Sequence, residues 1–461
     1  MSLSIVIMAA GKGTRMKSAH PKVLHRLAGR PLLGHVLDAA RALGAERTIV
    51  ITGHGAETVE AYVAQTEPAA QCVRQMPQHG TGHAVQQAVP LLPSSGTALV
   101  LNGDVPLIGV DTARALAQAS GGERLALLTI ELADPTGYGR ILRDPSGAIL
   151  GIVEHKDATE AQRRIREVYT GVMAAPAAWL RQAVMDLRND NAQGEYYLTD
   201  VVGMAVAQGM AVGSAAAPTE DEVLGVNSPA QLADLERRHQ RAQALALMEA
   251  GVRLADPARL DVRGNLLCGQ DVEIDINCVF EGRVQLDDGV RIGSHCVIRN
   301  ARIAAGTVIQ PFTHIDGGAQ GVEVGADCQI GPFARLRPGA SLGRDVHIGN
   351  FVEVKNSSMA DGAKANHLAY LGDATVGPRV NYGAGSITAN YDGANKHRTV
   401  IEADAHIGSN CVLVAPVTIG AGATIGGGSV ISRDAPPQQL TVARARQTSL
   451  SGWKRPVKGS R

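Results

Sequence analysis

Aliphatic residues recur every six positions through much of the second half of the chain. Two such series are unbroken: Val324, Ile330, Leu336, Leu342, Ile348 and Val354, and then Ile407, Leu413, Ile419, Ile425 and Ile431. An α-helix repeats every ~3.6 residues and a strand every two, so neither produces a period of six. A fixed short repeat is typical of a solenoid. The series therefore predicts a parallel β-helix of hexapeptide repeats with these side chains in its core; chance spacing is the alternative.

The first 228 residues follow a different pattern, in which strand-like and helix-like segments alternate. Residues 4–10, 47–52 and 97–104 read as strands, whereas residues 31–43 carry apolar side chains at helical spacing. This alternation predicts an α/β domain with a Rossmann-like, mostly parallel sheet. We expect three parts: an α/β domain at 1–228, a linker helix at 229–250, and a β-helix domain at 251–461.

Composition excludes some classes of partner. Lys and Arg together number 44, as do Asp and Glu, so the formal net charge is zero. No global field would attract nucleic acid or an anionic membrane. The chain shows no signal-peptide pattern and no run of ~20 apolar residues. We expect a cytoplasmic protein that acts on small molecules, without nucleic-acid or membrane partners.

The glycine-rich segment AAGKGTRMKSAHPK, residues 9–22, directly follows the first predicted strand. Ligands of open α/β sheets bind at this end of the strands. Gly11 and Gly13 allow backbone N–H groups to approach a phosphate, and Arg15 and Lys22 add charge. The segment has neither the GK[ST] of an ATPase loop nor the GxGxxG of a dinucleotide site. It predicts another kind of phosphate site, with a turn carrying solvated Lys and Arg as the alternative.

Several longer motifs carry a resemblance to a known family. These are AAGKGTRM followed by PK, LNGDVPL at 101, DPTGYGRI at 134, GIVEHKDA at 151, NAQGEYYLTD at 191, ANHLAYLGDA at 365 and NYDGANKHRT at 390. Nearly end to end, the chain resembles the bacterial bifunctional N-acetylglucosamine-1-phosphate uridyltransferases/glucosamine-1-phosphate N-acetyltransferases. The resemblance implies a left-handed β-helix and a homotrimer.

The resemblance also implies two reactions. Acetyl-CoA first acetylates glucosamine 1-phosphate, and UTP then donates UMP to N-acetylglucosamine 1-phosphate with release of pyrophosphate. The product, UDP-N-acetylglucosamine, supplies peptidoglycan and lipopolysaccharide precursors.

The uridylyl transfer site is expected in the first domain, where positioning and charge neutralisation dominate such chemistry. Asp104 ends a predicted strand and suits Mg²⁺; a helix N-cap or turn residue is the alternative. The resemblance assigns Asp104 and Asn227 to the metal and Arg15 and Lys22 to catalysis. It places UTP and the UDP-sugar on Ala9, Ala10, Gly11, Gly13, Lys22, Gln75, Gly80, Thr81, Gly103, Gly139, Glu154 and Asn227.

Two positions depart from the family pattern. Relatives carry Asn where this chain has Tyr169, and that Asn contacts the sugar, so we leave Tyr169 out of the site. Asn102 replaces an aromatic residue that is common before the following Gly-Asp pair.

The acetyl transfer site is expected where the six-residue rhythm is interrupted, between 357 and 400. Acetylation requires a neutral amine, so a base that titrates near neutrality is useful, and histidine is such a base. His367 is the candidate, with Glu353 available to orient its ring; an ordinary loop histidine is the alternative. The resemblance places glucosamine phosphate on Arg337, Lys355, Tyr370, Asn381 and Lys396. It places acetyl-CoA on Ala384, Asn390, Tyr391, Ser409, Gly427 and Arg444.

Three other classes of protein share parts of this plan. One is a single-activity sugar-nucleotide pyrophosphorylase with a structural or allosteric β-helix. Another is a zinc enzyme of the γ-carbonic-anhydrase type, which needs three converging histidines; the candidates are His295, His314, His347, His367, His397 and His406. The third is a translation exchange-factor subunit, which could dispense with the glycine-rich segment. The basic tail at 452–461 is either a solvated end or packs near a neighbouring subunit's acetyl-CoA site.

Overall fold

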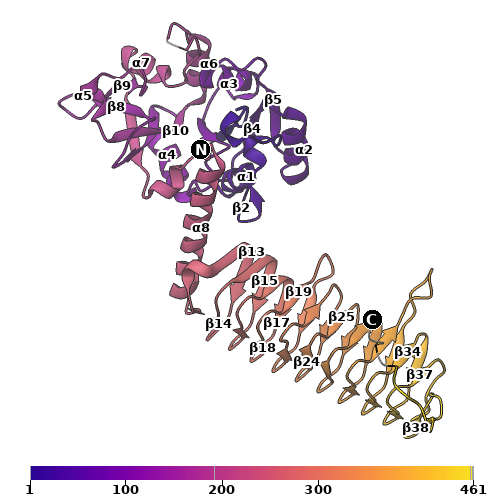
Figure 1. Cartoon of the computed structure of the whole chain (residues 1–461). Coiled ribbons are helices and arrows are strands. Elements are labelled where there is room, and N and C mark those ends of the chain that lie inside the picture. Colours follow the sequence, from indigo (N-terminus) through magenta and orange to yellow (C-terminus); the bar gives the residue numbers. More distant parts are fainter. Residues whose placement is uncertain (1, 192, 457, 459–461) are drawn as a thin grey trace. The chain divides into compact units, whose positions relative to one another are not determined.

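The computed structural model describes residues 2–191, 193–456 and 458, so part of the basic tail lies outside the described residues. The chain divides into two compact units, residues 1–239 and 240–461. The division falls within one helix, α8 (Pro229–Glu249). Figure 1 draws the first unit in indigo to magenta and the second mainly in orange to yellow. Within the described ranges, no helix combines the length and the apolar character that a membrane span requires.

The first unit is built on a nine-stranded sheet with the order β11-β7-β10-β6-β1-β4-β5, to which β8 and β9 add through β10. Its strands are β1 (Leu3–Met8), β4 (Arg47–Thr52), β5 (Gln71–Arg74), β6 (Thr97–Asn102), β7 (Leu125–Glu131), β8 (Gly139–Arg143), β9 (Ile149–Val153), β10 (Glu167–Pro176) and β11 (Val212–Ala216). Strands β1, β4, β5 and β6 are parallel, whereas β10 is antiparallel to β6 and β7. The predicted α/β sheet is confirmed, with β5, β4, β1 and β6 parallel; because β10 and the β8–β9 hairpin are antiparallel, the sheet as a whole is mixed.

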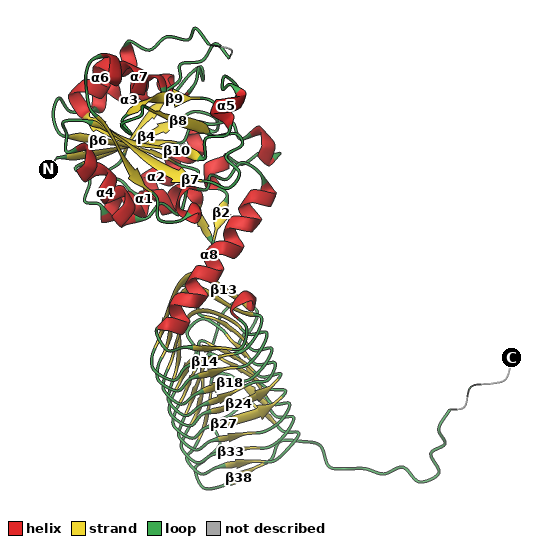
Figure 2. Cartoon of the chain, turned by 90° about the vertical axis from the view of Figure 1, so that its left-hand side faces the viewer, coloured by secondary structure: helices red, strands yellow, loops and turns green. Residues whose placement is uncertain are grey.

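Helices cover both faces of this sheet (Figure 2). They are α1 (Leu32–Ala42), α2 (Ala56–Thr66), α3 (Thr81–Ala88), α4 (Val110–Ser120), α5 (Glu160–Arg163), α6 (Ala177–Met185) and α7 (Asp200–Ala207); a short ribbon pairs β2 (Arg26–Leu27) with β3 (Arg30–Pro31). Side chains alternate across β1: Ile5 and Ile7 pack with α1, α2 and α4, whereas Val6 packs with α3, α6 and α7. This double burial explains why the strands read as continuous apolar runs.

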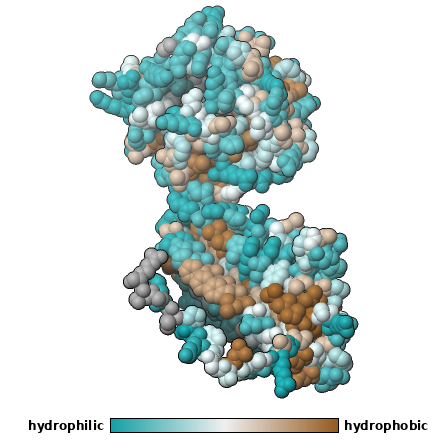
Figure 3. Space-filling model, turned by 45° about the vertical axis from the view of Figure 1, so that its right-hand side comes forward, coloured by the Kyte–Doolittle hydropathy of each residue, from teal (hydrophilic) through white to brown (hydrophobic). Residues whose placement is uncertain are grey.

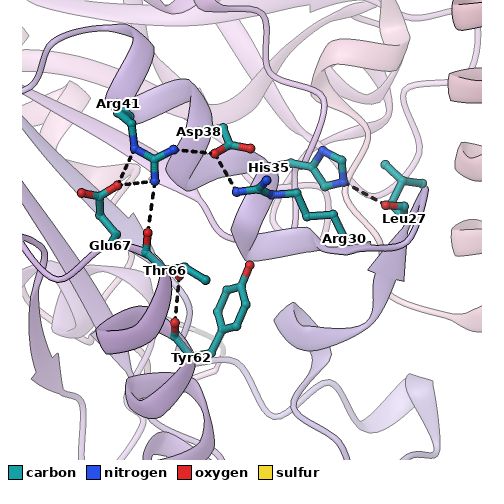
Figure 4. A network of polar contacts seen from close by, with 8 residues as sticks. All are labelled: Leu27, Arg30, His35, Asp38, Arg41, Tyr62, Thr66 and Glu67. Atoms are coloured by element: carbon teal, nitrogen blue, oxygen red, sulfur yellow. Dashed lines mark hydrogen bonds and ion pairs between the residues drawn. The ribbon is translucent and has the colours of Figure 1, made fainter. Parts of the chain in front are cut away.

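A polar network ties α1 to α2 (Figure 4). Arg41 donates to Glu67 and, at 3.2 Å, to the carbonyl oxygen of Thr66. Arg41 and Arg30 both donate to Oδ1 of Asp38, at 2.9 and 2.6 Å. These groups are substantially exposed, so each ion pair contributes at most about 1 kcal/mol. Arg41 links α1 to the C-terminal end of α2, and Arg30 links β3 to α1.

The second unit is a parallel solenoid with three stacks of short strands. One stack contains β12 (Arg253–Leu254), β14 (Glu273–Ile274), β16 (Arg291–Ile292), β18 (Val308–Ile309), β21 (Gln329–Ile330), β24 (His347–Asn350), β27 (Lys364–His367), β30 (Asn381–Tyr382), β33 (His406–Ile407), β36 (Thr424–Ile425) and β38 (Leu440–Thr441). The other two stacks begin with β13 (Leu260–Cys268), β15 (Cys278–Leu286) and β17 (Val297–Ile303), which extend across both.

After β17 the second and third stacks separate. The second stack contains β19 (His314–Asp316), β22 (Arg335–Leu336), β25 (Glu353–Lys355), β28 (Tyr370–Gly372), β31 (Ile387–Ala389), β34 (Val412–Val414) and β37 (Val430–Ile431). The third contains β20 (Val322–Val324), β23 (Ser341–Leu342), β26 (Ser358–Met359), β29 (Ala374–Val376), β32 (Thr399–Ile401) and β35 (Val417–Ile419).

The hexapeptide prediction is confirmed in the core. All eleven aliphatic residues of the two sequence series are buried. Val324 pairs with Leu342 eighteen residues later, so one coil of the solenoid consumes three hexapeptides. Leu342 pairs with Met359 after only seventeen residues, and Thr388 pairs with Leu413 after twenty-five. The sequence rhythm is therefore interrupted by two successive coils of seventeen residues and by a loop inserted between β31 and β32.

The α8 residues from Gln240 onward close the first coil of the solenoid. The buried Gln240 side chain donates to the carbonyl oxygen of Val262 at 2.9 Å and accepts from the Val262 N–H at 2.7 Å. Ala244, one turn later, is fully buried in the solenoid core. The Gln240 amide thus takes the place of a neighbouring strand on the open edge of β13.

Replacing Gln240 with Ala should expose this edge. Two buried backbone groups of Val262 lose their partners, so we expect the solenoid to lose about 2 kcal/mol of unfolding free energy. Hydrogen exchange at residues 260–268 should accelerate. Gln243→Ala, on the same helix, is the matched control, and equal exchange in both variants would show that Gln240 has no capping role.

Candidate active sites

A cleft of about 440 Å³ opens at the carboxyl ends of β1 and β6. The residues that line it are Met8, Ala9, Ala10, Gly11, Lys12, Lys22, Val23, Gln75, Gln78, Gly80, Thr81, Ala84, Asn102, Asp104 and Glu195. Gly13 has φ +59°, and a Cβ there would lie 2.7 Å from Cβ of Lys22, so the glycine permits this close approach. The cleft unites much of the predicted nucleotide site.

The ammonium group of Lys22 lies between two oxygens in this cleft. Lys22 donates a very short hydrogen bond to Oδ2 of Asp104 and a 3.1 Å bond to Oδ1 of Asn227. Asp104 and Asn227 are the two residues predicted to hold a metal ion. Both present an oxygen to the same cation, although they lie 82 and 205 positions from Lys22 in the sequence.

A second cavity, of about 420 Å³, shares Asn102 and Asp104 with the first. Arg15 and Asn227 also line it, together with Tyr138. Asp104 therefore borders two spaces that could hold two reacting molecules. Sequence reasoning assigned no role to Asn102, Tyr138 or Glu195, although each lies within a motif that carries the family resemblance; Gln78 lies in none of these motifs.

Three residues predicted for the sugar line neither cavity. Gly103 is packed against β1, since a Cβ there would lie 3.1 Å from the carbonyl oxygen of Met8. Gly139 and Glu154 lie close together on β8 and just after β9. Thr199 donates to Glu154 at 3.1 Å. Burial raises the pKa of the neighbouring Asp200, as do the charges of Glu154 and Asp157.

Tyr169 is a core residue in this structure. It packs on the α3, α6 and α7 face of the sheet and is almost completely buried. Within the described part of the chain, its hydroxyl group has no hydrogen-bond partner. Burial and the charge of Glu154 raise its pKa. The phenol is therefore neutral and carries an unpaired polar atom.

Tyr169→Phe should remove that unpaired hydroxyl and leave the ring in place. We expect the free energy of unfolding to rise by about 1 kcal/mol and the KM for the sugar phosphate to stay unchanged. Denaturant unfolding measures the first quantity and uridylyl transfer the second. Tyr382→Phe is the control, because that buried hydroxyl donates to the Tyr370 carbonyl at 3.5 Å. A raised KM in Tyr169→Phe would instead indicate contact with the sugar.

In the solenoid, four predicted site residues occupy the same position of successive coils: His367, Ala384, Ser409 and Gly427. Backbone hydrogen bonds connect these coils. The N–H of Gly385 donates to the carbonyl oxygen of His367, the N–H of Asn410 to that of Ala384, and the N–H of Gly428 to that of Ser409. Gly427 continues the column, and its carbonyl oxygen accepts from Arg444 at 2.7 Å. The candidate base and four predicted acetyl-CoA residues (Ala384, Ser409, Gly427 and Arg444) therefore lie along one edge.

The ring of His367 has a partner that the sequence analysis did not name. Its Nδ1 lies 3.1 Å from Oδ1 of Asn350. Glu353, expected to orient the ring, instead accepts from Arg337 at 2.8 Å and from Arg335 at 3.3 Å. A hollow of about 380 Å³ beside His367 is lined by Gly331, Pro332, Phe333, Gly349, Asn350, Phe351 and Asn366.

Positive charge gathers on the neighbouring stack of strands. Lys355 lies on β25 beside Lys396, which the inserted loop supplies. The pKa of Lys355 is lowered, chiefly by hydrogen bonding to Lys396 and then by partial burial. Two ammonium groups so close together favour an anion between them. Arg337 adds a third positive charge to this cluster.

The buried carboxylate of Asp373 offsets part of the positive charge of this cluster. Burial alone would raise its pKa, but hydrogen bonds from Asn356 and Asn390 and the charge of Lys355 lower it. Asn390, predicted to bind acetyl-CoA, is buried and donates to this carboxylate. Asp373 was missed by sequence reasoning, because its partners come from separate coils.

The remaining predicted residues lie around this region. Tyr370 pairs with Glu353 in register. Tyr391 is exposed on the inserted loop and donates to the Gly393 carbonyl at 2.6 Å. Asn381 is exposed on β30 in the first stack, in register with Lys364 rather than with His367.

The histidines considered for zinc have separate surroundings. His295 stacks on Phe312, His397 bonds Asp392 at 2.7 Å, and His347 lies 3.3 Å from Asp345. Among the described residues, no group of three or more His, Cys, Asp and Glu side chains is arranged to hold a metal ion.

Comparison with known proteins agrees with this two-part arrangement. Residues 5–168 match the MobA-like NTP transferase domain, and residues 321–356 and 398–433 match the bacterial transferase hexapeptide (six repeats). The chain is 73% identical over 461 residues to the bifunctional protein GlmU of Methylibium petroleiphilum, and 67% identical over 468 residues to that of Paracidovorax citrulli, with 99% of each chain covered in both cases. The chain therefore belongs to the family of bifunctional GlmU proteins, as the motifs predicted.

Proposed function

We propose that the chain makes UDP-N-acetylglucosamine from glucosamine 1-phosphate in two reactions, acetylation first and uridylyl transfer second. The observation that carries this proposal is the presence of two chemically different sites in separate units. One presents a glycine-rich cleft around Asp104, and the other presents a histidine beside a cluster of lysines and arginine. Acetylation comes first because the sugar nucleotide already carries the acetyl group. In a bacterial cytoplasm this product feeds peptidoglycan and lipopolysaccharide synthesis.

The uridylyl transfer requires two anions to be held together. An oxygen of N-acetylglucosamine 1-phosphate attacks the α-phosphorus of UTP, and the bond to the β-phosphate oxygen breaks to release pyrophosphate. The attacking phosphate needs no base, since it is already an anion. Arg15 and Lys22 stabilise the charge that develops on the phosphates, and the backbone of Gly11 and Gly13 leaves room for them.

The residues at Asp104 and Asn227 fit Mg²⁺. Both offer oxygen ligands, the kind that this ion prefers, and both already face a resident cation, the ammonium of Lys22. When bound, Mg²⁺ would neutralise negative charge on the phosphates.

Gln75 favours a uracil base. Its Nε2 donates to the carbonyl oxygen of Gly80 at 2.8 Å and lies 3.2 Å from Nδ1 of His83. The amide oxygen therefore remains to accept a hydrogen bond from the base. Uracil offers an N–H at position 3, whereas cytosine has an acceptor there, so this orientation favours uracil over cytosine.

The acetyl transfer requires removal of a proton from the amine. His367 accepts that proton while the amine nitrogen attacks the thioester carbonyl; the carbon–sulfur bond then breaks, and CoA leaves as the thiol after protonation. Arg337, Lys355 and Lys396 hold the sugar phosphate. Acetyl-CoA lies along the column that includes Ala384, Ser409 and Gly427.

We propose that the chain forms a homotrimer, and an exposed apolar band on the solenoid supports association between copies of the chain. Phe312, Phe333 and Phe351 stack in a ladder with ring centroids 5.1 and 5.3 Å apart, and Leu368 continues it on the next coil. These side chains are about half exposed, at 49, 47, 56 and 61%. Figure 3 shows a hydrophobic band across the coils. Burial of this band against another copy would bring a second subunit to the edge that carries His367.

One incubation tests the two activities together. Purified protein receives glucosamine 1-phosphate, acetyl-CoA, UTP and Mg²⁺, and free thiol and pyrophosphate are followed; a second incubation omits acetyl-CoA. We expect thiol, and pyrophosphate only when acetyl-CoA is present. In the same assays, Asp104→Ala should reduce uridylyl transfer at least ~100-fold and spare acetyl transfer, and His367→Ala should do the reverse.

Two results would contradict this proposal. Pyrophosphate without acetyl-CoA, together with no thiol, would indicate a single-activity pyrophosphorylase with a structural β-helix. Loss of both activities in either folded variant would contradict two independent sites.

Lys22 and a divalent cation should compete for Asp104. In Lys22→Met the carboxylate loses its resident cation, so we expect Mn²⁺, a probe for Mg²⁺, to bind on the order of tenfold more tightly without nucleotide. Electron paramagnetic resonance of free Mn²⁺ measures this. Lys12→Met, in the same cleft, is the matched control. Equal Mn²⁺ affinity in both variants would show that Lys22 does not compete with the metal for Asp104. Mn²⁺ binding that survives Asp104→Ala would place the metal elsewhere.

A further inference from the structure

We propose that Asn350 is the positioning residue that orients His367 and fixes which of its ring nitrogens is the base. The inference rests on the proposed role of His367 in acetyl transfer. It differs from the expectation for Glu353, whose carboxylate is bound to Arg335 and Arg337 in this structure.

Asn350 and His367 are held together by backbone as well as side chain. They pair in register at the ends of β24 and β27, on successive coils. The carbonyl oxygen of Asn350 accepts from the N–H of Leu368 at 3.0 Å. The side-chain contact between Oδ1 and Nδ1 is 3.1 Å. Two short strands of the scaffold thus fix both partners.

Gly349 allows the two coils to approach here. A Cβ at this position would lie 1.9 Å from the carbonyl oxygen of Asn366. Any side chain at position 349 would therefore push the coils apart just before Asn350 and His367. The close approach that brings the amide to the ring is a property of the coil itself.

The contact determines the tautomer of His367. An amide oxygen can only accept a hydrogen bond, so Nδ1 must carry the proton. The lone pair is then on Nε2, which becomes the basic atom. Without Asn350 the ring can rotate and exchange tautomers, and only part of the population presents a base to the amine.

An amide also differs from a carboxylate in charge. It orients the ring and stabilises the imidazolium less than a carboxylate would, so His367 can release the proton after each turnover. Asparagine orients a catalytic histidine in the same way in Cys-His-Asn proteases.

The solenoid contains a matched control. Asn277 and His295 form another Asn–His contact between successive coils, 3.0 Å long, near the start of the solenoid. His367 is the last residue of β27, whereas His295 lies in the turn before β17 with φ +61°; His295 stacks on Phe312 and belongs to neither proposed site. Asn277→Ala removes an Asn–His contact of similar length, formed there by Nδ2 of the amide and Nε2 of the ring, without touching the proposed chemistry.

The test compares Asn350→Ala, Asn350→Asp and Asn277→Ala in the full-length protein. Asn350→Ala should lower kcat of acetyl transfer roughly 10- to 100-fold, leave KM for both substrates within about twofold, and spare uridylyl transfer. Asn350→Asp keeps an acceptor and should recover much of kcat. Its carboxylate stabilises the imidazolium, so the acid limb of kcat against pH should move to higher pH. Asn277→Ala should match the unaltered protein.

A direct measurement accompanies the kinetics. With ¹⁵N-labelled histidine, the resonances lost in His367→Ala identify this ring, and their shifts should show a protonated Nδ1 and a bare Nε2. In Asn350→Ala they should move toward a mixture of tautomers.

The outcomes separate the two proposals. If His367→Ala retains acetyl transfer, the proposed function of His367 fails. If His367→Ala is inactive but Asn350→Ala keeps the normal kcat and the normal shifts, only the positioning role is overturned. If Asn350→Asp is as slow as Asn350→Ala, with no displaced acid limb, the amide acts on the fold rather than on the ring.

Discussion

The backbone hydrogen bonds between successive coils are the interaction on which the second unit depends. Each corner N–H donates to a carbonyl of the preceding coil, as Gly385 does to His367 and Asn410 to Ala384. This ladder turns residues far apart in sequence into neighbours along one edge. The proposed base and the acetyl-CoA residues require that adjacency, so the chemistry depends on coil register before it depends on any one side chain.

Coil length is the variable that selects which residues meet. A full coil of eighteen residues would place His367 beside Gly349. The coil between them is one residue shorter, and His367 instead pairs with Asn350. The aliphatic period predicted the solenoid and its buried residues, because burial repeats with the backbone. It could not predict the partner of His367, because the aliphatic series ends at Val354 and does not show how many residues the following coil lacks.

In the first unit, the sequence predicted the location of the site better than its lining. The glycine-rich segment after β1 and Asp104 after β6 follow from the strand order of an α/β sheet, because parallel strands end at one edge. Gln78 reaches the same cleft from a segment without a motif, and Glu195 reaches it from the NAQGEYYLTD motif, in which no residue was given a role of its own. Tyr169 illustrates the opposite case: its position in β10 was predicted as a departure from the family, but only the fold shows that its ring is turned into the core.

The two sites place different demands on their scaffolds. Uridylyl transfer moves no proton on the attacking group, so it requires charges at fixed positions, and loops at the edge of a sheet can supply Lys22, Arg15 and Asp104 from distant segments. Acetyl transfer needs one nitrogen lone pair aimed at an amine, which requires control of a single ring. A solenoid provides that control, because each coil is fixed by its neighbours. Asn350 acts through the same stacking that builds the fold, so orientation of the base and stability of the coil arise from one arrangement.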